Sequence, residues 1–215
     1  MTPPPAVAAA QIVTVSEDEA YAAMALLTVE EKRRIERLKS EPRKLAMLRT
    51  IAARRIWLAK YLSISPEAII LEQDDAGMPL LNGFAAGEVS FSRSAEWCAI
   101  ALANGRRVGI DLEFERDMNW SSVLDFLSLP DEANQIRSAV KESGELTPFF
   151  RAWCTKEAVL KLTGKGLKAG PKTLTLPNAA IEGENAVEFT IPLGVIHVRI
   201  AEIDSKVIAL ATMAA

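Results

Sequence analysis

The segment FFRAWCTKEAVLKLTGKGL, residues 149–167, decides the fold of this chain. Its apolar residues recur at helical spacing, which predicts an amphipathic helix with one buried face. Gly164 falls where that helix should end, because glycine adopts left-handed backbone angles without a Cβ clash. A Gly-Lys-Gly turn then follows the helix.

Three chemically distinct side chains share one stripe of this predicted helix. Trp153, Glu157 and Lys161 are four residues apart, so they lie on the same face. An acid and a base beside a tryptophan, just before a glycine-rich turn, can form a functional site. The same spacing also fits an ordinary intrahelical ion pair, which contributes only ~0.2–0.5 kcal/mol. The segment alone leaves both interpretations open.

Composition restricts the class of protein. The chain has 215 residues, of which 49% are hydrophobic and 25% charged, as is typical of a soluble globular protein. Its net charge of −3 lacks the overall basic character of a nucleic-acid-binding protein. Residues 1–10, MTPPPAVAAA, carry no basic segment and are expected to be a disordered tail. No run of about 18 apolar residues follows, so we expect a cytoplasmic protein without a membrane span.

The cysteines and the single histidine argue against two kinds of catalytic site. Cys98 and Cys154 lie in apolar runs and are expected to be buried free thiols. His197 lies in VIHVRI, where strand alternation directs it to solvent. One histidine so placed makes a Ser-His or Cys-His nucleophile and a histidine-rich metal site unfavourable.

The order of predicted elements is helices and then strands, twice, with a break near Asn104–Val108. This order predicts an α+β fold of two similar α/β halves, residues 11–106 and 107–215, the second carrying the chemically informative motifs. Asn104-Gly105 is typical of a β-hairpin turn joining strands 97–103 and 107–114. Helices are predicted over 17–27, 42–62, 120–127 and 131–140. A further helix is predicted to begin at Thr28, which has capping-box spacing with Glu31. Further strands are predicted over 11–15, 68–72, 88–91, 173–176, 186–191, 194–203 and 207–212.

A second motif, GIDLE at residues 109–113, places two carboxylates on one strand face. Asp111 and Glu113 project from the same side, whereas Ile110 and Leu112 point into the core. Neighbouring carboxylates repel one another unless a cation lies between them, and oxygen ligands suit Mg²⁺ or Mn²⁺. Acids on a solvent-facing strand edge are the alternative interpretation.

Glu157 would complete a set of three acids if this strand and the helix meet in space. Three carboxylates without a histidine fit a magnesium–phosphate site, where nearby Lys156, Lys161 and Lys165 could neutralise phosphate oxygens. The predicted helix over residues 42–62 carries a further row of cations, which fits either a solvated face or an anion site. That row comprises Arg43, Lys44, Arg49, Arg54 and Arg55.

The two motifs together, GIDLE at 109–113 and WCTKEAVLKLTGKGL at 153–167, resemble the 4'-phosphopantetheinyl transferases of the surfactin-synthetase type. The resemblance extends over most of the chain, and residues 28–62 are similar to the arginine-rich helical region of that family. It implies the 4'-phosphopantetheinyl transferase fold, with two halves related by a pseudo-two-fold axis and coenzyme A bound between them. It also implies a monomer, because single-half relatives must oligomerise to build the site.

The implied reaction transfers the 4'-phosphopantetheine arm of coenzyme A to a serine of an acyl or peptidyl carrier protein and releases 3',5'-ADP. Two other interpretations remain: a non-catalytic relative that binds coenzyme A or a carrier protein, and an unrelated Mg²⁺-dependent phosphohydrolase. The carrier could belong to fatty-acid, polyketide or nonribosomal-peptide synthesis. The cations Lys32, Arg33, Arg34, Arg37 and Lys39 could meet an acidic carrier or form a solvated helix face.

The resemblance also assigns roles to residues. Asp111, Glu113 and Glu157 would hold Mg²⁺ on the pyrophosphate, and Glu157 would help to activate the carrier serine. Lys161 would bind the phosphates and steady the leaving group, so that Asp111, Glu157 and Lys161 form the catalytic set. Further contacts to coenzyme A are expected from Arg43, Lys44, Ser92, Arg93, Lys156 and Lys165.

Two positions depart from the family pattern. Met78 stands between Gly77 and Pro79 where the family usually has a lysine, and Arg93 stands where it usually has a histidine. Arginine can bind phosphate through its permanently charged planar fork, but methionine cannot. Losing one partly buried phosphate contact would weaken cofactor binding by ~1–3 kcal/mol.

Overall fold

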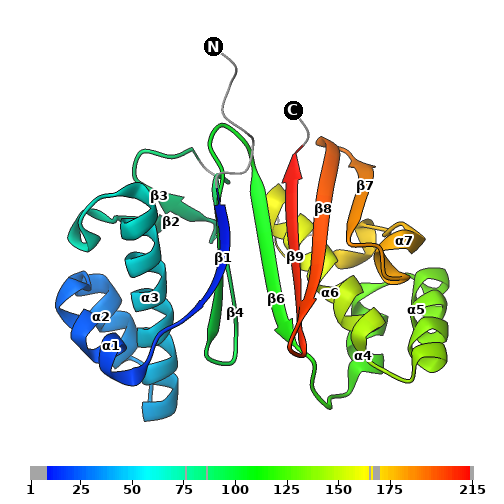
Figure 1. Cartoon of the computed structure of the whole chain (residues 1–215), viewed down its shortest axis with the longest axis horizontal. Helices are drawn as coiled ribbons and strands as arrows, with labels where there is room; N and C mark the ends of the chain where they lie inside the picture. The colour runs from blue at the N-terminus through cyan, green and yellow to red at the C-terminus, as the bar shows by residue number, and fades with distance from the viewer. Residues whose placement is uncertain (1–8, 76, 86, 165, 167–169, 214–215) are drawn as a thin grey trace.

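The structure is a computed structural model, which describes residues 9–213 except 76, 86, 165 and 167–169. Its strands form two larger antiparallel sheets and a short hairpin (Figure 1). The first sheet has the order β1 (Ala9–Thr14), β5 (Trp97–Leu102), β4 (Val89–Ser94). The second has the order β6 (Val108–Phe114), β9 (Lys206–Met213), β8 (Gly194–Ile203), β7 (Ala186–Ile191). The hairpin pairs β2 (Leu71–Gln73) with β3 (Pro79–Leu81).

Helices cover the outer flanks of the two larger sheets (Figure 1). Beside the first sheet lie α1 (Glu17–Ala22), the 3₁₀ turn η1 (Ala23–Leu26), α2 (Val29–Glu36), α3 (Glu41–Leu62) and η2 (Pro66–Ala68). Beside the second lie α4 (Trp120–Leu127), α5 (Pro130–Ser143), α6 (Thr147–Thr163), η4 (Pro171–Thr173) and α7 (Asn178–Ile181). The predicted α+β class is therefore confirmed. The boundary after residue 106 and the approximate two-fold relation between halves stay predictions.

Local signals in the sequence fix several helix ends. The capping box at Thr28 is present, since Thr28 Oγ1 accepts from the Glu31 N–H while Glu31 Oε2 accepts from the Thr28 N–H. Gly164 ends α6 with φ of 75°, as predicted. Strand β1 includes Ala9 and Ala10, which were expected in the disordered tail, and residues 1–8 lie outside the described structure. No described helix is both long and apolar enough to cross a membrane.

Buried Arg55 fixes the angle between α2 and α3. Its guanidinium donates to Glu31 Oε2 at 2.7 Å and to the carbonyl oxygens of Pro66 and Ile69. The ion pair therefore joins α2 to α3 and to the turn after α3. This contact holds α2 in place, and α2 carries Arg34 at the cleft described below.

Helix α6 lies directly on β6 because of one glycine. A Cβ added at Gly109 would come 1.9 Å from the carbonyl oxygen of Ala158, so no larger residue fits between strand and helix. The helix also covers β9, and its buried face joins the core of this part of the molecule. The expectation that the GIDLE strand and the helix meet in space is confirmed.

Two sequence-based expectations about strands are wrong. Asn104-Gly105 lies in a turn, but β5 and β6 do not pair, because β1 and β4 occupy both edges of β5 and β6 pairs with β9. Residues 173–176 do not form a strand. Pro171 opens a 3₁₀ turn there, and the polar backbone beyond it bonds to side chains of α5 and α6 instead of a neighbouring strand.

The two larger sheets meet where β4 and β5 face β6. Small residues of β5, Ala99 and Ala101, pack against Val108, Ile110 and Leu112. At one end of this contact, the amine of Lys206 lies 4.9 Å from the ring centre of Trp97 and 5.2 Å from that of Phe114. This cation–π contact joins a ring of β5 to a ring of β6.

Candidate active site

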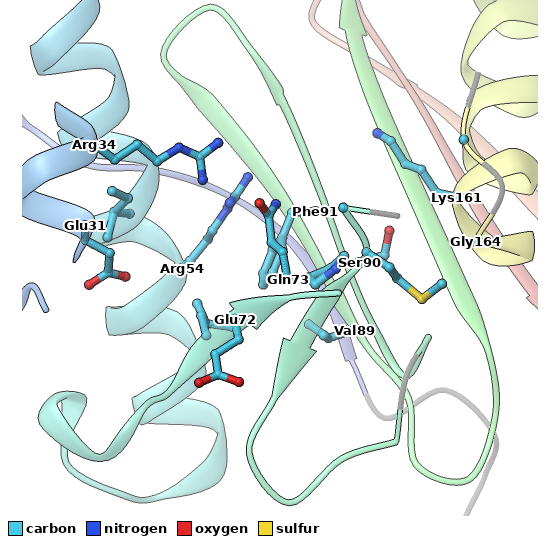
Figure 2. Close-up of a pocket in the computed structure, with 16 residues that line it drawn as sticks. Glu31, Arg34, Arg54, Glu72, Gln73, Val89, Ser90, Phe91, Lys161 and Gly164 are labelled. Carbon is cyan, nitrogen blue, oxygen red and sulfur yellow. The ribbon is translucent and has the colours of Figure 1, made fainter. Parts of the chain in front are cut away.

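A cleft of about 270 Å³ opens where α2, α3, the β2–β3 hairpin and β4 face the end of α6. In Figure 2, Arg34 and Arg54 reach into it from the helical side, whereas Lys161 and Gly164 approach from the opposite side. The volume lies near the lower limit of small-molecule sites. The cleft therefore combines residues from both predicted halves of the chain.

Unpaired cations gather on the helical side of the cleft. Among the described residues, neither Arg34 nor Arg54 forms an ion pair with a carboxylate. The Arg54 guanidinium stacks 4.3 Å above the ring centre of Phe91, and its Nε is buried without a hydrogen-bond partner. Burial lowers the pKa of Arg54, and the positive charges of Arg34 and Arg93 lower it further. An anion in this position would relieve that repulsion.

The sequence-based list of cofactor contacts omits Arg34 and Arg54. Helical spacing in the sequence could have identified Arg54, because Arg43 and Arg54 are eleven residues apart and so share one face of α3. That face lines a second cavity, of about 500 Å³, to which Arg43 and Arg93 contribute and which shares Arg34 and Arg54 with the cleft. Lys44 is not among the residues that line either cavity, and its amine pairs with Glu41 at 2.6 Å.

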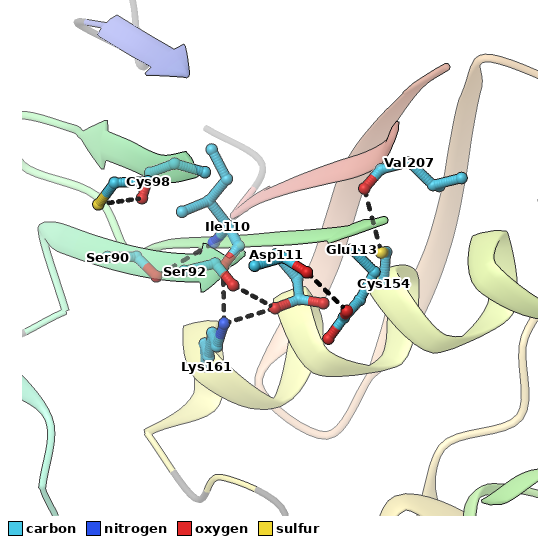
Figure 3. Close-up of polar contacts among 11 residues, drawn as sticks. Ser90, Ser92, Cys98, Ile110, Asp111, Glu113, Cys154, Lys161 and Val207 are labelled. Atoms are coloured by element: carbon cyan, nitrogen blue, oxygen red, sulfur yellow. Dashed lines mark hydrogen bonds and ion pairs between the residues drawn. The ribbon is translucent and has the colours of Figure 1, made fainter. Parts of the chain in front are cut away.

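Asp111 forms the centre of the polar contacts between β6, β4 and α6 (Figure 3). Its Oδ1 accepts hydrogen bonds from Lys161 Nζ at 2.6 Å and from Ser92 Oγ at 2.7 Å. Its Oδ2 is buried and has no hydrogen-bond partner in the described structure. A buried charged oxygen without a partner is unfavourable, which makes this atom a candidate cation ligand.

The second acid of the strand, Glu113, is held by two donors. Its Oε2 accepts from Arg116 Nη1 at 2.7 Å and from Ser94 Oγ at 3.0 Å. Arg116 is partly exposed and also lies over the rings of Phe150 and Trp153, each 5.8 Å away. Trp153 thus packs against Phe149 and Phe150 beside Arg116 and Glu113.

Glu157 lies on α6, within electrostatic range of the two acids of β6. Its pKa is raised to about 7, chiefly by burial and also by the charges of Asp111 and Glu113, while Lys161 opposes this rise. At neutral pH the Glu157 carboxyl is therefore close to half protonated. A group poised in this range can accept and return a proton.

The donor chemistry of Asp111, Glu113 and Glu157 fits a hard divalent cation. All three offer carboxylate oxygens, which Mg²⁺ and Mn²⁺ prefer. The unpartnered Oδ2 of Asp111 and the raised pKa of Glu157 both reflect crowded negative charge that a cation would relieve. Among the described residues, however, no three histidine, cysteine, aspartate or glutamate side chains are already arranged as a metal cluster. Lys161 and Arg116 hold one oxygen each of Asp111 and Glu113 instead.

Lys156 requires a correction. It was expected to contact the cofactor, but its side chain is fully buried. Its amine pairs with Glu132 at 2.7 Å and donates to the carbonyl oxygens of Pro171 and Leu174. Although Lys156 is adjacent to Glu157 in sequence, one residue along a helix turns a side chain by about 100°, to another face. We therefore leave Lys156 out of the candidate site. Lys165, another expected contact, lies outside the described residues.

Met78 forms an apolar wall of the cleft. Its methyl group lies 2.1 Å from the position that a Cβ on Gly164 would occupy, so Met78 packs directly over that glycine. The contact connects the β2–β3 hairpin to the end of α6. Met78 itself brings no charge to this wall, but the Arg107 Nη1 lies 3.4 Å from the same Cβ position and donates to the carbonyl oxygen of Leu162.

The two cysteines and the single histidine lie where the sequence predicted them. Cys98 and Cys154 are buried free thiols, and burial raises the pKa of both, well above its usual range for Cys154. His197 is exposed on β8 and its Nδ1 lies 3.0 Å from a carboxylate oxygen of Glu188. None of the three is suited to be a nucleophile or metal ligand in the candidate site.

The chain is similar to known proteins over part of its length. Residues 107–210 match the family model of the 4'-phosphopantetheinyl transferase superfamily. The chain is 34% identical over 114 residues to the 4'-phosphopantetheinyl transferase HetI of Nostoc. The aligned segment covers 51% of this chain and 48% of that protein. It is 30% identical over 150 residues to the L-aminoadipate-semialdehyde dehydrogenase-phosphopantetheinyl transferase of Xenopus laevis, covering 64% of this chain and 49% of that protein.

A third relative is the 4'-phosphopantetheinyl transferase AcpT of Salmonella typhimurium, 32% identical over 114 residues, or 52% of this chain and 57% of that protein. This chain thus spans about half the length of the curated relatives it matches. The matched segment 107–210 contains both β6 and α6, with Asp111, Glu113, Glu157 and Lys161. Residues 107–210, slightly less than half of the chain, are therefore similar to the 4'-phosphopantetheinyl transferase superfamily.

Proposed function

We propose that this protein transfers the 4'-phosphopantetheine arm of coenzyme A to a serine of an acyl or peptidyl carrier protein, and that 3',5'-ADP is the second product. The observation that carries the proposal is the ion pair of Asp111 with Lys161, whose charges both act on Glu157, beside a cleft lined by arginines without carboxylate partners in the described structure. The superfamily match over residues 107–210 supports it.

Asp111, Glu113 and Glu157 would hold Mg²⁺, or Mn²⁺, through carboxylate oxygens. The bound ion would neutralise charge on the pyrophosphate of coenzyme A. Asp111 contributes an Oδ2 that has no competing partner in the described structure, and Lys161 would exchange its contact with Asp111 for a phosphate oxygen. The lysine would then steady the charge that develops on the leaving group.

Glu157 would act as the base that takes the proton of the carrier serine, directly or through water. The serine oxygen attacks the phosphorus next to pantetheine, the bond from that phosphorus to the bridging oxygen breaks, and 3',5'-ADP leaves with the electron pair. The pKa of Glu157, about 7 without metal, would be lowered by a cation at these acids, so that the carboxylate would be available as a proton acceptor near neutral pH. Because the partner supplies the nucleophile, the chain requires no activated serine or cysteine of its own.

The arginine group would bind the phosphates of coenzyme A. Arg34 and Arg54 line the cleft itself, while Arg43 and Arg93 border the adjoining cavity. Arginine forms bidentate hydrogen bonds to phosphate, and the absence of carboxylate partners for Arg34 and Arg54 in the described structure leaves their charge available. Lys44, paired with Glu41, would contribute less, and Ser92 would act through Asp111 instead of through the cofactor.

The carrier protein would bind near both the acidic strand and α2, where Arg33 and Arg37 are exposed. Carrier proteins are typically acidic around their serine, which complements these cations. We further propose that the chain has two halves related by a pseudo-two-fold axis, resembles the surfactin-synthetase type, acts as a monomer and works in the cytoplasm.

The transfer is tested by incubating the purified protein with Mg²⁺, coenzyme A and several unrelated apo-carriers. A mass gain of about 340 Da on the carrier serine is expected, corresponding to the transferred arm in a phosphoryl-transfer reaction. No gain on any carrier would overturn the proposed transfer. Met78, an apolar residue at the position of a lysine in the family pattern, favours a second candidate, a relative that binds coenzyme A without transfer. Calorimetric binding of coenzyme A with unchanged carrier mass would identify that second function.

A further inference from the structure

Three alternate residues of β4 form a row of buried hydroxyls that faces β6. Ser90, Ser92 and Ser94 are 4%, 8% and 8% exposed and share one face of the strand by their spacing of two. Their neighbours Phe91 and Arg93 point the other way, and Phe91 lies under Arg54. The described β4 and β6 share no backbone ladder, since they belong to different sheets.

The hydroxyls replace that ladder. Ser90 Oγ accepts from the backbone N–H of Ile110 at 3.1 Å, and Ser94 Oγ accepts from the N–H of Phe114 at 3.3 Å. The two bonded residues are twenty positions apart in the sequence in both pairs, Ser90 with Ile110 and Ser94 with Phe114. Because this separation is constant, β4 and β6 run in the same direction. The serines thus satisfy buried backbone donors that no strand partner reaches.

The same row of hydroxyls reaches two of the acids of the candidate site. Ser92 Oγ donates to Asp111 Oδ1 at 2.7 Å (Figure 3). Ser94 Oγ donates to Glu113 Oε2 at 3.0 Å. Ser90 bonds to the backbone and to no carboxylate in the described structure. The row therefore divides into two members that hold acids and one that holds only the strand.

The contact with Asp111 fixes which of its oxygens stays free. Ser92 and Lys161 both bind Oδ1, which restricts rotation of the carboxylate and leaves Oδ2 without a partner. If Lys161 turns to a phosphate, Ser92 is the remaining donor that holds Oδ1. Hydrogen bonds of this kind orient metal ligands, and their removal typically costs 10–100-fold in metal affinity.

We infer that Ser92 and Ser94 are positioning residues that orient Asp111 and Glu113 toward a divalent cation. The inference rests on the proposed function, because it needs a cation at these acids. It means that β4, from the first sheet, sets the geometry of ligands that belong to β6 in the second sheet. The affinity for metal then depends on how the two sheets pack.

The test compares Ser92→Ala, Ser94→Ala and Ser90→Ala in the full chain. Each removes one buried hydroxyl from the same strand face, so Ser90→Ala is a matched control for loss of packing and hydrogen bonding. The probe is Mn²⁺, titrated in the presence of 3',5'-ADP and followed by electron paramagnetic resonance. Thermal melting of each variant measures its stability separately.

The expected result is a loss of about tenfold or more in Mn²⁺ affinity for Ser92→Ala and Ser94→Ala, with Ser90→Ala within about twofold of the wild type. Three variants with equal losses of affinity would show a purely structural role and overturn the inference. So would unchanged affinity in Ser92→Ala and Ser94→Ala, or a wild-type chain that binds no Mn²⁺. The carrier mass assay is independent of this titration, so the expected pattern of affinities together with a failed transfer would refute only the proposed function.

Discussion

The backbone oxygen of Ala158 lies directly above Gly109, at 1.9 Å from the position of a Cβ on that residue. This close approach brings α6 onto β6, and so brings Lys161 to Asp111. The glycine of the GIDLE motif is therefore required by packing between a helix and a strand, because its own φ is not in the left-handed region. The acids of the strand can meet Glu157 only where the strand allows the helix this close.

Substituting Gly109→Ala should therefore destabilise the protein strongly. The new methyl group would displace α6, and overpacking of this kind costs about 1–3 kcal/mol or more. Urea unfolding measures the loss. Gly144→Ala is the matched control, since a Cβ there meets no atom within 4 Å and only its positive φ of 72° resists the change, at about 1–2 kcal/mol. Equal losses in the two variants would contradict the importance of the close approach.

The raised pKa of Glu157 predicts a stability that depends on pH. A carboxyl whose pKa rises from 4.5 to about 7 on folding destabilises the folded state as pH increases through that range. Glu157→Gln removes this effect, so without metal the variant should exceed the wild type at pH 8 by roughly 1–2 kcal/mol, after allowance for solvent screening. The two proteins should be alike near pH 4. Urea unfolding at both values tests this, and a variant less stable than the wild type at pH 8 would contradict it. In the carrier assay, Glu157→Gln should abolish transfer.

The buried pair of Lys156 and Glu132 should contribute to stability and not to cofactor binding. Lys156→Ala leaves Glu132 as an unpaired buried charge, and the expected loss is about 3–5 kcal/mol. Replacing both residues, as Lys156→Met with Glu132→Leu, should recover part of the loss, because no unpaired charge remains. Chemical unfolding measures both variants. If folded Lys156→Met instead binds coenzyme A more than about tenfold more weakly than the wild type, Lys156 belongs in the site after all.

Arg54, in contrast to Lys156, should contribute to cofactor binding and not to stability. It lies among like charges without a carboxylate partner in the described structure, so Arg54→Met should leave stability unchanged or raise it. Affinity for 3',5'-ADP should fall by about tenfold or more, as expected when a charged hydrogen bond to phosphate is lost. Calorimetry measures the binding. Arg137→Met, which removes a half-buried cation paired with Asp125 and outside the residues that line the cleft, is the control and should bind 3',5'-ADP normally.

Met78→Lys should strengthen coenzyme A binding. The new amine would stand over Gly164 at the wall of the cleft, beside the Arg107 guanidinium, whose Nη1 is already held by the Leu162 carbonyl oxygen. One added phosphate contact corresponds to about 1–3 kcal/mol, or roughly fivefold to 150-fold in affinity. Met24→Lys adds the same charge at an exposed position of η1 and should change nothing. An equal gain from both variants would indicate general electrostatic attraction instead of a defined contact.

Sequence signals of short range were sufficient for the parts of the fold that depend on neighbours in the chain. The capping box of Thr28 with Glu31 and the end of α6 at Gly164 involve residues within one or two turns, so the sequence shows both partners of each contact. The spacing of Asp111 and Glu113 likewise fixed their common strand face. These patterns, together with the family motifs, predicted the helix, the strand and the acids of the site.

The partners of those elements depended on contacts between distant residues. The turn at Asn104-Gly105 predicted a hairpin, yet β6 pairs with β9 because both edges of β5 are already occupied. Lys156 and Glu157 are adjacent in the chain, yet one lies in the core and the other faces the acids, since a helix turns each successive side chain to a new face. The sequence by itself determined that Asp111 and Glu113 share a strand face and that Glu157 and Lys161 share a helix face, because these spacings are local. Only the tertiary structure decided that Ser92 and Ser94 hold the acids and that Arg34 and Arg54 share the cleft, because burial and charge environment arise from non-local packing.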